Sequence, residues 1–196
     1  VLQSLNSQIR RLRDADERDQ AKIRELADVA VRIADTIVLP WVRRQDEQFT
    51  KKQMLAFEIM PAESQNAAGR YDQALRRYQQ IVQRYGDEAR RNIEVMFGQA
   101  EAQYHTGNFG EANRRYNTII KAVREGIAAG TPGVSKDQYY WTARMRIYQM
   151  IDAQAAGAKN QTLFVSTMNN LRGEGQNAPA WYQQVVRTIR DRHRPE

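Results

Sequence analysis

Apolar residues in the first 39 positions recur in alternating steps of three and four. Only two aspartates, Asp16 and Asp19, interrupt this frame, and both lie in a charged stretch. The positions of the frame are Leu2, Leu5, Ile9, Leu12, Asp16, Asp19, Ile23, Leu26, Ala30, Ile33 and Ile37. Such spacing is typical both of a coiled coil and of a long amphipathic helix that packs on its own domain. We expect one long helix over residues 1–39, ended by Pro40, and a role for it in self-association or in joining a larger complex.

The apolar positions lose their regular period in residues 40–61. Trp41 and Phe49 are apolar, but they and their neighbours keep neither a helical nor a strand spacing. We expect a connecting segment here with a helix over about 46–59. A break or kink should follow at Pro61, because proline inside a helix removes a hydrogen bond and clashes with the preceding turn.

A helical pattern returns at residue 62 and continues to about residue 125. Apolar stripes with steps of three and four predict three helices in this region. They cover about 71–85, 93–104 and 109–123. Gly86 has the place of a C-terminal cap, and the run from His105 to Asn108 has the composition of a turn. Helix, short turn and helix in succession predict antiparallel hairpins.

Two parts of this region repeat each other. The run from Gly69 to Tyr78 matches the run from Gly107 to Tyr116 at an offset of 38 residues, which is 107 minus 69. Glycine, an aromatic residue, alanine, Arg-Arg and tyrosine recur at the same places. An internal repeat of this length is typical of a stacked helical array. The glycine permits a tight turn, and the alanine permits the two helices of a hairpin to approach closely.

This repeat resembles the tetratricopeptide repeat signature over about residues 55–125. The residues that carry the resemblance are Ala100, Tyr104, Gly107, Phe109, Ala112 and Tyr116, with a second copy at Gly69, Tyr71, Ala74 and Tyr78. The first-helix half of the second copy, about 54–68, departs from the signature because it contains Pro61. The resemblance implies an all-α fold of antiparallel hairpins stacked as a short solenoid, in addition to the long N-terminal helix.

The resemblance also implies a concave groove that binds another protein. Its groove positions in the better repeat are Phe97, Glu101, Tyr104 and His105. Members of the family that grip a C-terminal carboxylate use lysine and asparagine at such positions. Phe97 and Glu101 stand there in this chain, so we expect a more hydrophobic or helical ligand instead.

Residues 134–193 predict a degenerate third hairpin and a capping helix. A helical face follows Ser135, and its polar side carries Arg144, Arg146 and Gln149, which could give charge complementarity to a partner. We expect a turn over 157–160 and a helix over about 163–171. Pro179 suits the first turn of a final helix with Trp181, Val185 and Ile189 on one face.

The charge of the chain leaves a second function open. The formal net charge is +7, and it comes from residues after position 50, because the first 50 residues carry nine basic and nine acidic side chains. Arginine pairs recur along the array at positions 76–77, 90–91 and 114–115. Repeated basic side chains on a solenoid could follow a phosphate backbone, so a nucleic-acid-binding solenoid is the alternative.

The sequence offers little chemistry for catalysis. It has no cysteine, and its two histidines, His105 and His193, have no metal-ligand spacing. Glycine-rich phosphate loops, serine nucleophile motifs, targeting signals and apolar runs of membrane-spanning length are missing, and no compartment is indicated. We expect no enzymatic activity, no cofactor and no metal. The sequence favours a non-catalytic interaction module or assembly subunit that binds a peptide or helix of a partner in its groove.

Overall fold

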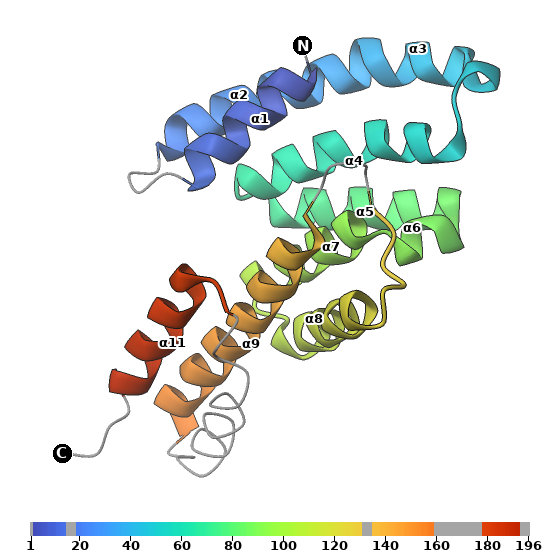
Figure 1. Cartoon of the computed structure of the whole chain (residues 1–196). Helices are drawn as coiled ribbons and strands as arrows, with labels where there is room; N and C mark the ends of the chain where they lie inside the picture. The colour runs from blue at the N-terminus through green and yellow to red at the C-terminus, as the bar shows by residue number, and fades with distance from the viewer. Residues whose placement is uncertain (1, 15–18, 131–134, 159–177, 193–196) are drawn as a thin grey trace.

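The computed structural model describes residues 2–14, 19–130, 135–158 and 178–192, and these residues form an all-α protein. Each helix packs mainly on its neighbours in the sequence, and together they form a stack (Figure 1). The described residues contain no β-strand beyond an isolated bridge between Asn92 and Ala129. The prediction of an all-α helical solenoid is therefore confirmed.

The N-terminal region folds as a hairpin rather than as one helix over residues 1–39. Helix α1 (Leu2–Asp14) lies against helix α2 (Gln20–Ile33). The carboxylate of Asp19 caps α2 by accepting a hydrogen bond from the backbone N–H of Lys22 at 2.9 Å. An aspartate that interrupts the heptad frame thus starts a new helix. The apolar seam packs inside the chain, since Leu2, Ile9, Ile23 and Ala27 are buried together.

The long helix begins at Gln20 and extends past Pro40. It continues through a π-helical turn, η1 (Ala34–Val38), into α3 (Leu39–Arg44). The wide turn accommodates Pro40 near the start of α3, where its missing N–H costs little. The buried positions along this helix are three or four residues apart, except for one step of five residues across the π-turn. They are Ile23, Ala27, Ala30, Ala34, Leu39 and Val42. Ile37, which the heptad frame placed in the seam, is therefore 61% exposed.

Pro61 does not break the next helix. After a short 3₁₀ turn, η2 (Asp46–Gln48), helix α4 (Lys51–Ala67) runs through Pro61 without interruption. It starts with a capping box in which Thr50 and Gln53 exchange hydrogen bonds. Helix α4 packs on α2 and on the two helices that follow it in the array. Packing on several sides outweighs the cost of a proline in a helix interior, about 3 kcal/mol.

The central hairpins confirm the repeat. Helix α5 (Tyr71–Tyr85) pairs with α4, and α8 (Phe109–Arg124) pairs with α7 (Ile93–His105). Both turns contain a glycine in the left-handed region, Gly69 at φ 78° and Gly107 at φ 80°. They also share their hydrogen bonds, because Arg70 N–H donates to Gln65 O and Asn108 N–H donates to Gln103 O, each at 2.9 Å. The link between α5 and α7 contains the short helix α6 (Asp87–Arg91).

A close contact between α5 and α7 fixes how the two hairpins pack. The fully buried ring of Tyr78 lies against the backbone of Gly98, where a Cβ atom would be 2.1 Å from the ring. The carbonyl of Gly98 also accepts a hydrogen bond from Asn66 of α4 at 2.8 Å. Ala74 and Ala112, the alanines of the repeat, are likewise fully buried.

The C-terminal part extends the array. Helix α9 (Lys136–Ala158) packs on α8, and α11 (Ala180–Arg192) packs on α9 through a cluster around Tyr148 and Tyr182. The turn predicted from residue 157 is displaced, because α9 continues to Ala158. The helix predicted over 163–171 lies outside the described residues, as does His193.

Candidate functional site

A partly buried ion pair joins α7 to α9 among the predicted groove residues. Nε and Nη2 of Arg146 donate to the two carboxylate oxygens of Glu101 at 2.9 and 2.8 Å. The Tyr116 hydroxyl donates to Glu101 Oε1 at 2.5 Å. Only 16% of the Glu101 side chain and 20% of the Arg146 side chain are exposed. Most of the side-chain hydrogen bonds of Glu101 and Arg146 therefore join these two residues to each other.

The environment of Glu101 keeps it ionised. Burial alone would raise its pKa, but the His105 imidazole, the charge and hydrogen bonds of Arg146, and the Tyr116 hydroxyl outweigh burial and lower the pKa to about 2. Burial and the adjacent carboxylate raise the pKa of Tyr116, so its hydroxyl remains a donor. The Glu101–Arg146 pair is therefore a charged bridge between α7 and α9 at neutral pH.

The three aromatic groove positions have different surroundings. Phe97 packs edge-on against Tyr139, with ring centroids 4.9 Å apart, and belongs to the core between α7, α8 and α9. The ring of His105 stacks on that of Tyr71 at 4.4 Å. Tyr104 lies under the Arg146 guanidinium, 4.8 Å from the ring centroid. Of these three residues, only Tyr104 lines the cleft described below.

Arg144 lies outside this network. It donates to the hydroxyls of Tyr140 and Tyr148 of its own helix at 3.1 and 3.3 Å. A further interaction with Tyr182 of α11 places Arg144 at the interface between α9 and α11. Burial lowers the pKa of Arg144, but its tyrosine partners, Tyr182 among them, outweigh this effect and raise it. The predicted site residues therefore fall into two groups. Glu101, Tyr104, His105, Arg146 and Gln149 gather at one place, whereas Phe97 and Arg144 lie in helix interfaces.

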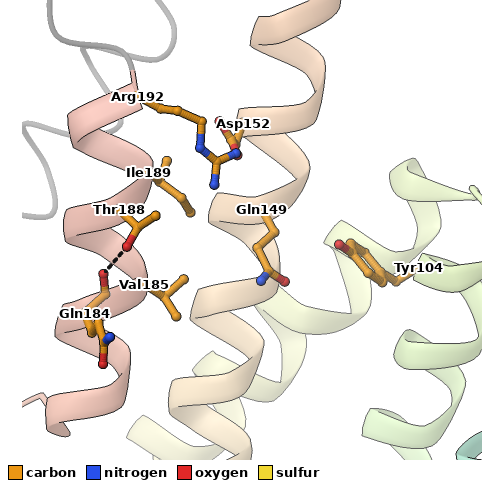
Figure 2. A pocket seen from close by; sticks show the side chains of 8 residues that line it. All are labelled: Tyr104, Gln149, Asp152, Gln184, Val185, Thr188, Ile189 and Arg192. Carbon is orange, nitrogen blue, oxygen red and sulfur yellow. Dashed lines mark hydrogen bonds and ion pairs between the residues drawn. The ribbon is translucent and has the colours of Figure 1, made fainter. Parts of the chain in front are cut away.

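A cleft of about 490 Å³ opens beside the network, between α9, α11 and the end of α7 (Figure 2). Its lining residues are Tyr104, Gln149, Asp152, Gln184, Val185, Thr188, Ile189 and Arg192. Sequence reasoning identified Tyr104 and Gln149 but missed the wall that α11 contributes. The apolar face of α11 was visible in the sequence, yet no signal showed which helix it packs on.

The cleft carries no net charge. Arg192 donates to Asp152 across its end at 2.9 Å, so the two charged lining residues neutralise each other. The remaining lining side chains are aromatic, amide, hydroxyl or aliphatic. Such a surface suits an uncharged ligand better than a phosphate or a carboxylate.

Several arginines of the predicted basic stripe are paired with carboxylates of the chain itself. Arg77 forms a two-pronged ion pair with Asp35, both distances being 2.8 Å. Arg90 and Arg114 pair with acidic residues of their own helices. Arg115 donates to Gln99 and Gln103 at 2.7 and 2.9 Å. These contacts reduce the charge available for a phosphate backbone.

The comparison with known families agrees with this architecture. A tetratricopeptide repeat family model matches residues 66–130, from the last turn of α4 to the loop after α8. This segment resembles a tetratricopeptide repeat. The match covers about a third of the chain, and neither a curated protein nor a solved structure matches the chain.

The family connects the fold to a mode of action. Tetratricopeptide repeats are protein–protein interaction modules and are generally non-catalytic. In the part of the chain that the structure describes, no group of three acidic or histidine side chains is placed to hold a metal ion. Among the same residues, no helix is long and apolar enough to cross a membrane.

Proposed function

We propose that this chain is an interaction module that holds a partner protein in the cleft between α7, α9 and α11. The observation that carries the proposal is the placement of the cleft. It adjoins the tetratricopeptide segment, and the Glu101–Arg146 bridge fixes the two helices that form two of its sides. A rigid frame around a binding surface lowers the ordering cost of association.

The proposal is tested by filling the cleft. Thr188→Trp would place a large ring in it, because Thr188 is an exposed residue of its α11 wall. Thr118→Trp on α8 is the matched control. Thr118 is equally an exposed helical threonine, and the hydroxyl of each residue donates to the carbonyl four positions earlier at 3.0 Å.

The readout is affinity capture from native extract with nuclease present, at low and high salt, followed by mass spectrometry. We expect one protein to be recovered in near-stoichiometric amount by the wild-type chain and by Thr118→Trp at both salts, and to be lost with Thr188→Trp. Equal recovery with both variants would overturn the cleft as the binding surface. Recovery that vanishes with nuclease or high salt would support the arginine-driven nucleic-acid alternative instead.

We also propose that the N-terminal helices contribute to self-association through their exposed side. Leu2, Ile9 and Ile23 are buried within the chain, whereas Ile37 and Trp41 are 61% and 44% exposed. Sedimentation analysis of Ile37→Glu would show a weakened oligomer if this surface is used. An unchanged sedimentation coefficient at all concentrations would argue against it.

A further inference from the structure

The amide of Gln149 has a fixed orientation. Nη1 of Arg146, the same guanidinium that clasps Glu101, donates to Gln149 Oε1 at 2.9 Å. The guanidinium is itself held by its two bonds to Glu101 and by the Tyr104 ring beneath it. Because the carbonyl side of the Gln149 amide is engaged, the side chain turns its NH₂ group to other partners. Gln149 thus presents donors beside the cleft.

Two further side chains of the cleft can donate. Tyr104 and Gln184 both line it, on opposite sides of Gln149 as Figure 2 shows. Within the described part of the chain, neither the Tyr104 hydroxyl nor the Nε2 groups of Gln149 and Gln184 form a hydrogen bond. On the α11 wall, the partly exposed Val185 supplies an apolar surface beside these polar groups.

From this arrangement we infer that the cleft binds an extended, uncharged peptide segment of the partner and recognises its backbone carbonyl groups. The inference rests on the proposed function and names the partner's chemistry. Gln149 Nε2 and the Tyr104 hydroxyl donate to carbonyls of the segment, and a small apolar side chain of the segment packs on Val185. A charged segment is disfavoured, because Asp152 and Arg192 already neutralise each other.

Free carbonyl groups separate an extended segment from a helix. Helical carbonyls are engaged inside the helix, except in its last turn. An extended chain, in contrast, offers a free carbonyl at every residue.

A proline peptide is the sharpest probe of this inference. It is extended without internal hydrogen bonds, and each proline has a carbonyl acceptor but no N–H donor. We would titrate acetyl-octaproline-amide into the ¹⁵N-labelled full chain and follow the side-chain NH₂ signals of its glutamines. Octaglutamate, octalysine and a helical alanine-rich peptide of similar length are the comparison ligands.

Two substitutions remove a donor and keep the surrounding contacts. Gln149→Glu replaces the NH₂ group by an acceptor oxygen, while its carboxylate can still accept from Arg146. Tyr104→Phe removes the hydroxyl and keeps the ring under the guanidinium. Gln80→Glu, an exposed residue of α5 away from the cleft, is the control for the added charge.

We expect octaproline to shift the NH₂ signals of Gln149, and each donor variant to bind it about five- to tenfold more weakly. Gln80→Glu should bind like the wild type, and the melting temperatures of all three variants should stay near that of the wild type. No shift at Gln149 with millimolar octaproline, equal binding by Gln149→Glu, or tighter binding of a charged or helical peptide would overturn the inference. If the captured partner is still lost with Thr188→Trp, the proposed function survives that failure.

Discussion

Replacing Gly98 by alanine tests how closely α5 and α7 pack. The new Cβ would lie 2.1 Å from Cζ and 2.2 Å from Oη of Tyr78. Ordinary contacts begin near 3.4 Å, so the ring or a helix must move by more than about 1 Å. The Tyr78 ring is fully buried and cannot swing into solvent. Overpacking of this kind costs about 1–3 kcal/mol or more, against a gain of up to about 1 kcal/mol from alanine in a helix.

We therefore expect Gly98→Ala to lower the free energy of unfolding by about 2 kcal/mol. For a chain of this size the melting temperature should fall by about 4–8 °C, measured by far-ultraviolet circular dichroism. Gly110→Ala on α8 is the matched control, since no atom lies within 4 Å of its new Cβ. It should leave the melting temperature unchanged or slightly raised.

A double-mutant cycle identifies the cause of the loss. Tyr78→Leu removes the ring atoms that meet the new Cβ, so adding Gly98→Ala to Tyr78→Leu should cost much less than adding it to the wild type. The reasoning fails if Gly98→Ala melts at or above the temperature of Gly110→Ala. It also fails if the cost of Gly98→Ala is the same on both backgrounds.

Three further predictions concern charge and capping. The pKa of Glu101 is lowered from 4.5 to about 2 in the folded chain, so its contribution to stability, about 3 kcal/mol, is present above pH 4.5 and lost as the pH falls toward 2. Urea unfolding at pH 5 and pH 3 should show a smaller decline for Glu101→Gln than for the wild type, and equal declines would contradict the lowered pKa. Arg146→Met leaves the Glu101 carboxylate without its cation and should lower the free energy of unfolding by about 3–5 kcal/mol. The same substitution should cost clearly less on a Glu101→Gln background, and strictly additive losses in urea unfolding would refute the coupling. Asn92 caps α7 by accepting hydrogen bonds from the N–H groups of Glu94 and Val95 at 2.9 and 3.1 Å. Asn92→Ala should therefore lower the free energy of unfolding by about 1 kcal/mol in thermal unfolding, and an unchanged melting temperature would show that the cap is dispensable.

The repeat region was predictable because its determinants are local. Gly69 and Gly107 mark turns that need a positive φ, and the apolar stripes between them follow from helical spacing alone. The same local rules failed at Pro40 and Pro61. There, a π-turn and packing on several sides override the preference of proline to end a helix.

The candidate site was only partly predictable, since its contacts join distant parts of the chain. Glu101 and Arg146 were both proposed as groove residues, but no sequence pattern showed that they pair across 45 positions. Arg144 was placed with them, although its neighbours on α9 and α11 turn it toward tyrosines. Which side of α9 receives α11 depends on tertiary packing, and so the cleft itself lay beyond sequence reasoning.

The π-turn at Ala34–Val38 makes the long N-terminal helix sensitive to its residue count. Thr36 is exposed there, so exchanging its side chain for another helix-compatible one should be tolerated. Deleting Thr36 would shorten the step from Ala34 to Leu39 from five residues to four, and a regular α-turn would then keep Leu39 and Val42 on the same face as Ala30 and Ala34. Inserting one more residue would instead rotate Leu39 and Val42 by about 100° relative to Ala30 and Ala34. Evolution can therefore remove one codon from this turn, whereas the gain of a codon would expose one half of the helix's buried face.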